Sequence, residues 1–434
     1  MKRMWVGGLV LVAILVAAGP RRARADACQP CAESIVDPKM HGRSLKSYWG
    51  VASKTRPPDP EVLAKAYDQG HLALCGTPDQ WEWNMFMGMV SAELGKFDQA
   101  GCYFAEAVKH ATEAKDQKRA GDNRGHYWTD HYNEAINLAR SEAYDRAVEQ
   151  FDIALAIDPS SCKTYVQKSA ALINLRRFTE AVSVLERGLE VCPADTTNQK
   201  ILFSALHNQG ITEIKEAEAA KEDSTRHRLY ADAASWFERA DQLDPGAMDN
   251  VYNLGLVYFQ LVGLGDSTRA GDARQTFERF LARAEKKEER ANTLYQLTLL
   301  EVRAKNWEKA DQYADRFIAA DPHDPTAYQL KAVATTERGK AELSEAYIIF
   351  YNSLEKGKPV ENLDAWIGQA KTKYGAAGDV PKALKEKGNP DEVRSYTDSS
   401  GNDMDSFFYW AKGEAIAFYG GHKRGALAFP AQTP

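Results

Sequence analysis

Cysteine is the residue type in this 434-residue chain whose number and spacing point most directly to chemistry. Cys28 and Cys31 are separated by two residues, the spacing of thiol pairs that alternate between dithiol and disulfide forms. The complete set is Cys28, Cys31, Cys75, Cys102, Cys162 and Cys192. An even number of cysteines in an exported chain favours structural disulfides over free thiols. The elements that carry these residues decide between a redox-active pair and structural bonds.

The best-placed disulfide joins Cys162 to Cys192. Cys162 begins one expected helix and Cys192 ends the next, so antiparallel packing of the two helices brings both residues to the same end of one hairpin. The bond requires Cα atoms within about 7 Å of each other. Two free, buried thiols are the alternative. Cys28 with Cys31 and Cys75 with Cys102 are then the remaining pairs.

A redox role for Cys28 and Cys31 would require a strand before the pair and a helix after it, within a compact α/β domain. The pair instead precedes a long run of helical repeats. Covalent haem attachment would require a histidine directly after the second cysteine, where the chain has Ala32. Redox activity of this pair is therefore an alternative function and not the first hypothesis.

Other catalytic and ligand-binding motifs are missing from the sequence. The nine histidines do not have the spacing of a zinc site, and the glycines between Gly263 and Gly271 are not followed by the Gly-Lys-Ser/Thr of a phosphate-binding loop. The Gly-x-Ser-x-Gly motif of a nucleophile elbow does not occur. We therefore expect neither catalytic residues, nor a metal site, nor a cofactor.

The first 25 residues have the pattern of an export signal. Lys2 and Arg3 precede an apolar run from Met4 to Ala18, and Ala23-Arg24-Ala25 is a small-x-small cleavage site. The run of about 15 residues is short for a membrane span, which needs about 20. Arginines directly after the run oppose translocation, so a retained membrane anchor is the alternative to cleavage. We expect export to a bacterial periplasm or cell envelope, and the absence of Asn-x-Ser/Thr sites agrees with this.

The elements that must position these residues follow from a repeated pattern. Ala147, Phe151, Ala154 and Pro159 recur 34 residues later as Ala181, Leu185, Gly188 and Pro193. Apolar residues at three-to-four spacing form two runs in each copy, which predicts two amphipathic helices joined by a short turn. Small residues suit the close crossing of these helices, because larger ones would overpack it. Each proline ends the second helix, since it lacks the backbone donor that a continuing helix needs.

A 34-residue period with this order of small, aromatic, small and proline residues resembles the tetratricopeptide repeat (TPR) family, whose unit is a helix-turn-helix. The resemblance implies an all-α solenoid of stacked helical hairpins that presents a surface to other proteins. A single hairpin cannot bury its own apolar face, so such units stack into arrays.

The pattern divides the chain into four segments. We expect a signal peptide at residues 1–25, an extended lead-in at 26–59, a TPR-like solenoid of about six or seven repeats at 60–376, and a β-containing cap at 377–434. Within the solenoid, Glu113–Gly125 is interpreted as a charged linker. The charged run Glu213–Arg228 is expected to lengthen both helices of its hairpin, and a helix from Asn362 to Tyr374 to cap the array.

The C-terminal segment changes its periodicity. Aromatic and aliphatic runs around Phe407–Trp410, Ala415–Tyr419 and Gly425–Phe429, separated by glycines, predict an antiparallel meander of three strands. About 45 residues of this segment loosely resemble the small sheet of outer-membrane-assembly lipoproteins. A plain β-cap on the solenoid is the preferred interpretation.

The candidate partner-binding residues come from the first helix of each repeat, which lines the concave side of such an array. Tyrosines share one position, aliphatic residues a second position one turn later, and arginines flank the strip: Tyr132, Tyr252, Tyr295, Ile136, Leu256, Leu299, Arg140 and Arg303. Tyrosine offers a large contact area at low entropic cost, so the strip suits an extended peptide or a helix. Burial of these side chains between neighbouring helices is the alternative. The lysine and asparagine set of chaperone-tail binders is absent, so an acidic peptide C-terminus is not the expected ligand.

The sequence therefore favours a non-enzymatic scaffold that binds a protein or peptide partner. The net charge of −6 gives no basic field for nucleic acid. An accessory subunit that holds a catalytic partner is a further alternative, and the oligomeric state stays open. Contact with a membrane is expected only through an uncleaved leader.

Overall fold

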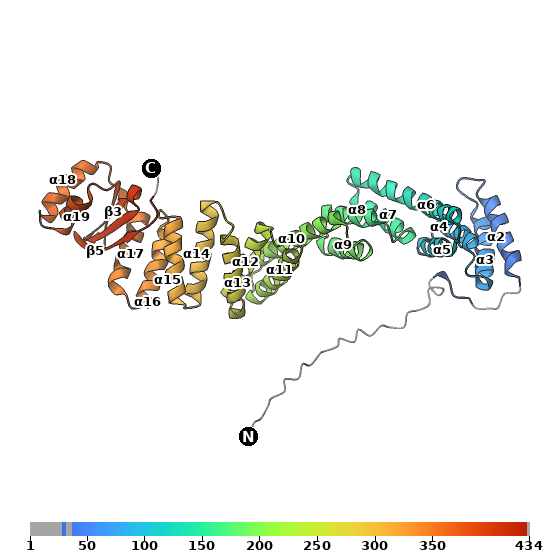
Figure 1. Ribbon diagram of the computed structural model, residues 1–434, viewed down its shortest axis with the longest axis horizontal. Helices are drawn as coiled ribbons and strands as arrows, with labels where there is room; N and C mark the ends of the chain where they lie inside the picture. Colours follow the sequence, from blue (N-terminus) through green and yellow to red (C-terminus); the bar gives the residue numbers. More distant parts are fainter. Residues whose placement is uncertain (1–27, 32–36, 432–434) are drawn as a thin grey trace, which may run out of the picture. The chain divides into compact units, whose positions relative to one another are not determined.

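A computed structural model describes residues 28–31 and 37–431 of the chain. The expected signal peptide lies outside these residues. The chain divides into two compact units, Met1–Leu202 and Phe203–Pro434, and each is described separately below (Figure 1).

The first unit consists of antiparallel helix pairs, in which α2 packs on α3, α4 on α5, α6 on α7 and α8 on α9. Its helices are α2 (Pro38–Ala52), α3 (Pro60–Gly76), α4 (Trp81–Glu93), α5 (Phe97–His110), α6 (Ala114–Arg140), α7 (Tyr144–Ile157), α8 (Cys162–Asn174) and α9 (Phe178–Val191). α10 (Thr196–Ala219) begins in this unit and continues into the second.

The helix ends follow from the local sequence. Asp59 caps α3, since its carboxylate accepts hydrogen bonds from the backbone N–H groups of Glu61 and Val62, and Pro60 occupies the first helical position, where no donor is needed. Asp324 and Pro325 begin α16 in the second unit in the same way.

The repeat residues occupy the expected places. Ala135, Ala147, Phe151, Ala181 and Leu185 are completely buried in the helix crossings. Pro159 also has a function beyond ending α7, because its carbonyl accepts a hydrogen bond of 3.0 Å from the hydroxyl of a tyrosine in the following helix, Tyr165. The second unit has the same hydrogen bond, from the Tyr328 hydroxyl to the Pro322 carbonyl at 2.8 Å. Both units therefore connect successive hairpins by the same contact.

The turns inside several hairpins contain a residue in the left-handed backbone region. Gly95 (φ 71°) and Gly339 (φ 73°) hold this position in two hairpins, where glycine adopts it without strain. Glu142 (φ 62°), Arg176 (φ 58°) and Lys305 (φ 55°) adopt it in three others. A side chain in this region costs roughly 1–2 kcal/mol relative to the right-handed one.

Two expectations for the first unit were wrong. The described part of the expected extended lead-in, residues 26–59, contains a helix, because Pro38–Ala52 form α2, whose Leu45 and Ala52 are completely buried. Glu113–Gly125 is not a linker either, since Glu113 is the N-cap of the 27-residue helix α6 and the residues after it form its first turns. Both segments are mostly polar, and a helix that buries one narrow stripe leaves a weak apolar period in the sequence.

The second unit continues the array and closes it with a sheet. Its helices are α11 (Asp223–Leu243), α12 (Met248–Gly263), η1 (Ser267–Arg269), α13 (Ala270–Leu281), α14 (Lys287–Arg303), α15 (Trp307–Ala320), α16 (Pro325–Glu337), α17 (Ala341–Glu355), α18 (Leu363–Tyr374), α19 (Asp379–Lys387) and η2 (Trp410–Lys412). The expected lengthening at Glu213–Arg228 is confirmed, because α10 has 24 residues and α11 has 21.

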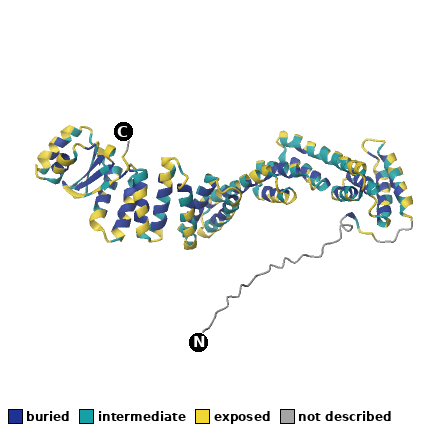
Figure 2. Ribbon diagram, in the orientation of Figure 1, coloured by how far each residue is buried: buried dark blue, intermediate teal, exposed yellow. Residues whose placement is uncertain are grey.

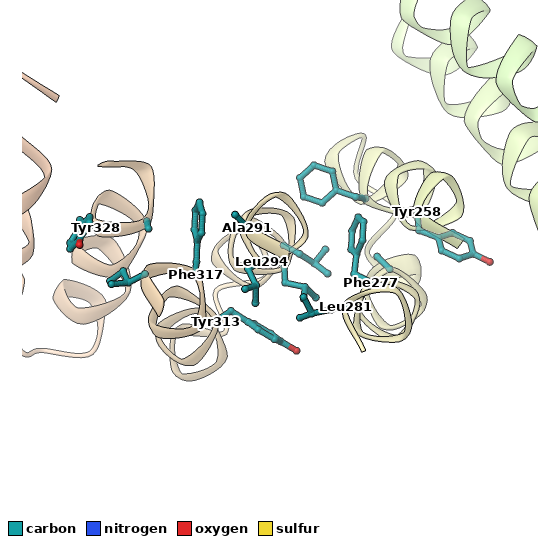
Figure 3. Packing of buried hydrophobic residues seen from close by; sticks show 14 of the residues in the cluster. Tyr258, Phe277, Leu281, Ala291, Leu294, Tyr313, Phe317 and Tyr328 are labelled. Carbon is teal, nitrogen blue, oxygen red and sulfur yellow. The ribbon is translucent and has the colours of Figure 1, made fainter. Parts of the chain in front are cut away.

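One hydrophobic cluster runs through this unit from α10 to the last strand. Figure 3 shows the part in which Phe277 and Leu281 of α13 face Leu294 of α14, with Phe317 of α15 on the next layer. Buried residues lie where paired helices face each other, and exposed residues lie on the outer faces (Figure 2). Each hairpin therefore completes the core of its neighbour, as stacking requires.

The C-terminal sheet has five antiparallel strands in the order β1-β2-β3-β4-β5. They are β1 (Lys358–Pro359), β2 (Glu392–Thr397), β3 (Asp403–Tyr409), β4 (Glu414–Tyr419) and β5 (His422–Ala428). The meander expected around Phe407, Ala415 and Gly425 is present as β3, β4 and β5, but the count of three strands was wrong. β2 carries charged residues such as Glu392 and Arg394, which hid its alternation.

Side chains alternate between the two faces of the sheet, and both faces carry apolar residues, so helices cover both. Phe408 of β3 packs in the cluster of the helical array, whereas Phe407 packs in a second cluster with α18 and α19. α17 contacts the sheet from the array side, and α18 and α19 cover the other side (Figure 1). The sheet itself thus closes the array, and α18, which we expected to do so, covers the far face of the sheet.

Candidate functional site

The three tyrosines of the expected strip make similar ring contacts. Their phenylalanine partners do not all share one repeat position, because Phe151 and Phe277 stand four residues after the repeat alanine and Phe317 stands seven after it. Each tyrosine ring meets the phenylalanine of the second helix in its own hairpin edge-on: Tyr132–Phe151 at 5.9 Å and 62°, Tyr252–Phe277 at 6.1 Å and 61°, and Tyr295–Phe317 at 6.2 Å and 64° between ring centroids and planes. α10 places His207 against Phe237 in the same way, at 5.4 Å and 66°. The repeat register that located these residues is therefore present in both units.

The strip residues of the second unit are half-buried. Tyr252, Leu256, Tyr295 and Leu299 all pack against the hydrophobic cluster of the array while keeping part of their surface exposed. Burial raises the pKa of the Tyr252 hydroxyl, so this group stays protonated as a hydrogen-bond donor. Both interpretations made from the sequence, a contact surface and burial between helices, therefore apply in part. One side of each tyrosine ring packs against the core, and the other side is exposed.

Tyr132 has further contacts of its own in the first unit. Its ring stacks on Trp128 at 4.7 Å and 22°, and the Lys163 ammonium lies 4.8 Å from the centre of the ring. Burial raises the pKa of its hydroxyl. Ile136, one turn later, is half-buried. Side chains of this chain therefore already occupy much of the surface around Tyr132.

The two flanking arginines are exposed. The Arg303 guanidinium lies 4.4 Å from the centre of the Phe259 ring, a cation–π contact that holds it beside the strip. Within the described part of the chain, neither Arg140 nor Arg303 has a carboxylate close enough for an ion pair. Both guanidinium groups can therefore donate hydrogen bonds to carboxylates of a binding partner.

A surface cavity of about 340 Å³ continues the strip at the last hairpin. It lies between α16 and α17, and its lining includes Gln329, Val333, Ile348 and Tyr351. Val333 and Ile348 are large aliphatic residues that are 39% and 43% exposed. Val333 stands four residues after Gln329, as Leu299 stands four after Tyr295. The sequence interpretation missed this hairpin because a glutamine takes the place of the tyrosine.

The cysteines confirm one expected disulfide and correct two. Cys162–Cys192 is present, with Cα atoms 6.0 Å apart. The other bonds are Cys28–Cys102 and Cys31–Cys75, with Cα distances of 5.5 and 5.6 Å, so Cys28 with Cys31 and Cys75 with Cys102 were wrong. A redox pair made of Cys28 and Cys31 is excluded in this structure. The segment that carries them lies between α3 and α5, and each cysteine bonds to a different helix.

A second cavity, of about 310 Å³, adjoins the Cys31–Cys75 bond. His71 lies one helical turn before Cys75, and its ring nitrogens are 3.7 and 3.8 Å from the Cys75 sulfur. Burial lowers the pKa of His71, so its imidazole is neutral at neutral pH. Glu106 and His110 of α5 also line the cavity.

In the described part of the chain, no helix is long and apolar enough to cross a membrane.

Comparisons with known proteins are limited to the fold. No protein-family model matches the chain, and no curated protein matches it. Among solved structures, MamA is 18% identical and covers 50% of this chain and 96% of its own, with a TM-score of 0.32. A thermophilic TPR protein of Thermus thermophilus is 17% identical (48% and 99% covered, TM-score 0.24), and YrrB, a TPR protein with an unusual peptide-binding site, is also 17% identical (52% and 97%, TM-score 0.29).

The helical repeats are TPR-like. The chain is a TPR-like helical-hairpin array that ends in a small antiparallel sheet, as the 34-residue period implied.

Proposed function

We propose that the chain is a non-enzymatic protein–protein interaction scaffold of the cell envelope. Its partner, a protein or peptide, binds along the first helices of the second unit, over Tyr252, Tyr295 and the cavity beside Val333. The observation that carries this proposal is the continuity of one apolar position through Leu256, Leu299 and Val333, with the last of them exposed beside a cavity.

The exposed aliphatic side chains of this face favour binding, because a partner that covers them removes apolar surface from water. Full burial of a valine or isoleucine side chain contributes about 1.5–3 kcal/mol, and Val333 and Ile348 are 39% and 43% exposed, so covering both contributes about 1–2.5 kcal/mol of the roughly 8 kcal/mol of a micromolar affinity. The half-buried tyrosines add contact area with little loss of side-chain freedom, because their inner side is already packed. Arg303, held beside the strip by Phe259, supplies a positive charge at its edge.

A location outside the cytosol is supported by the cysteines. All six form disulfides, and such bonds persist in oxidising compartments such as the bacterial periplasm. N-terminal sequencing of the protein isolated from its native cells tests this part of the proposal. A mature chain that begins at Asp26 is expected. A chain that keeps the leader and contains free thiols contradicts export.

The binding face is tested by cross-linking in the native cells. A photoreactive amino acid replaces Val333, and the matched control carries it at Leu243, an aliphatic residue of similar exposure at the end of a second helix. We expect a discrete adduct from position 333 and none from position 243. Equal adducts from both positions would place binding elsewhere.

A second variant ties the adduct to the cavity. Ile348→Asp puts a charge on the opposite wall without disturbing the core, because this side chain is already 43% exposed. It is expected to remove most of the adduct formed from position 333, since burying an unpaired carboxylate is costly. An undiminished adduct would mean that the partner contacts Val333 without entering the cavity.

A further inference from the structure

Three possible metal ligands of the first unit converge beside the cavity at α3. The Cys31 and Cys75 sulfurs and a His71 ring nitrogen all lie within 4.8 Å of one another. His71 and Cys75 are four residues apart, so they share one face of α3, and Cys31 approaches this face from the N-terminal segment. Thiolate and imidazole are ligands that select zinc and similar soft cations.

We propose that Cys31, His71 and Cys75 form a redox-gated zinc site. While the disulfide is closed, both sulfurs are bonded to each other and the site binds no metal. When it is opened to the dithiol, the two thiolates and the imidazole bind one zinc ion. The site is independent of the proposed interaction face, which lies in the other unit.

The distances suit this geometry. Tetrahedral zinc with Zn–S of about 2.3 Å and Zn–N of about 2.0–2.1 Å places sulfur and nitrogen ligands about 3.6 Å from each other. The Cys75 sulfur is already 3.7 and 3.8 Å from the two His71 nitrogens. The two sulfurs must separate, which rotation about the side-chain bonds of the exposed Cys31 allows, and the His71 ring must turn so that one nitrogen points at the metal.

The second disulfide keeps the ligands together after reduction. Cys28 lies three residues before Cys31 and is bonded to Cys102 of α5. The N-terminal segment therefore stays attached to α5 when the Cys31–Cys75 bond opens. The two bonds also differ in accessibility. Cys31 is exposed, whereas Cys28 is buried in the hydrophobic cluster formed by α2, α3, α4 and α5. A thiol reductant therefore reaches the Cys31–Cys75 bond first.

The chemistry balances with a dithiol as the reductant. Its two thiols supply two electrons and two protons, so it becomes a cyclic disulfide while Cys31 and Cys75 become thiols. Zinc then displaces one proton from each cysteine, and neutral His71 binds through a ring nitrogen without losing a proton. The fourth position opens on the cavity of about 310 Å³, where water has room to bind.

The experiment uses the full-length protein, oxidised or treated with limiting dithiothreitol, with zinc binding followed by calorimetry. Alkylation and peptide mapping identify the opened bond, and circular dichroism reports whether the helices persist. We expect new thiols at Cys31 and Cys75 only, an unchanged helical signal, and binding of a single zinc ion by the reduced form but not by the oxidised form.

Two histidine variants make the test specific. His71→Ala is expected to weaken zinc binding by the reduced protein by roughly tenfold or more, because a ligand is lost. His41→Ala is the control, since His41 is a partly buried histidine of the same unit that hydrogen-bonds Gln69 and not the cysteines. The proposal is overturned if His71→Ala binds zinc as the native chain does, if the oxidised protein binds it equally well, if Cys28–Cys102 opens first, or if reduction unfolds the helices.

Discussion

The two units stabilise similar helix pairs by different means. The first contains all six cysteines and three disulfides, and its buried residues fall into separate clusters, such as one around Leu45 and Met87 and another around Phe104 and Ile157. The second has no cysteine. One cluster extends through its helical array from Ala217 to Phe429, and another lies between the sheet and α18 and α19.

The difference teaches that cross-links and a continuous core are alternative solutions for a stacked array. A disulfide stabilises chiefly by restricting the unfolded chain, whereas a continuous core gains by removing apolar surface from water. The sheet that closes the second unit extends this core by one more layer, through Phe408 and Ala417. The predictions below test this contrast, from the largest expected effect to the smallest.

Phe350→Ala is expected to cost about 3–5 kcal/mol of unfolding free energy, because it leaves a cavity where the array meets the sheet. Phe350 is buried between Tyr328 and Phe408, with ring centroids 5.7 and 6.0 Å away. Denaturant unfolding of the full chain measures the loss. Leu343→Ala on the same helix is the control, since Leu343 is exposed, and a comparable loss there would mean that the cost does not come from a cavity in the core.

The double substitution Cys162→Ser with Cys192→Ser is expected to cost about 2–4 kcal/mol, because it frees a loop that the disulfide closes in the unfolded chain. We expect this loss of stability in the first unit only. Thermal unfolding of the full chain, followed by proteolysis with peptide mapping, assigns the earlier transition to residues of that unit. Earlier cleavage within α14 or α15 would show that the units do not unfold independently.

Gly88→Ala and Gly255→Ala are expected to cost about 1–3 kcal/mol each, and to a similar extent, because both overpack a helix crossing. A Cβ atom would lie 2.7 Å from the Phe104 ring in the first unit and 2.8 Å from the Phe277 ring in the second. Gly121→Ala is the control, since no atom lies within 4 Å of its added Cβ, and it is expected to stabilise α6 by about 0.5–1 kcal/mol. Melting temperatures of the three variants decide the matter, and a loss in only one unit would mean that the crossings are not equivalent.

The smallest effect concerns a buried carboxyl in the second unit. Burial raises the pKa of Asp405, whose oxygens accept hydrogen bonds from Tyr374 and Ser395. A raised pKa in the folded state means that this group contributes stability below the unfolded pKa of about 3.9 and loses it as pH rises through the folded pKa.

Asp405→Asn is therefore expected to abolish this loss, so that the difference in stability between variant and native chain grows in favour of the variant as pH rises from 4 towards neutrality. Melting temperatures across this range measure it. A difference that is constant with pH would mean that Asp405 titrates alike in folded and unfolded chains.

Local patterns in the sequence predicted most of the helical architecture and one disulfide. Ala147 and Phe151 recur at a fixed period, and Cys162–Cys192 closes a single hairpin, so both follow from neighbouring elements. Cys28–Cys102 spans 74 residues, and its pairing depends on how α2, α3 and α5 pack. No local pattern carries that information.

The proposed binding face rests on residues that the sequence indicated only in part. The tyrosine register predicted Tyr252 and Tyr295 as partner-binding residues, and both rings contact a phenylalanine of their own hairpin edge-on. The sequence could not reveal that these rings are half-buried, because the same residue type fits a core and an interface. The sequence did not indicate the proposed zinc site at Cys31, His71 and Cys75 for another reason, since Cys31 reaches α3 only through the tertiary fold.

The left-handed turns at Glu142, Arg176 and Lys305 have a consequence for engineering. At each of these three residues the backbone adopts the left-handed conformation, which glycine adopts without strain at Gly95 and Gly339. Replacing the three residues by glycine would relieve local strain in hairpins of both units while leaving every apolar contact in place. These turns are therefore points where the thermal tolerance of the protein can be raised without altering its core or the face proposed for its partner.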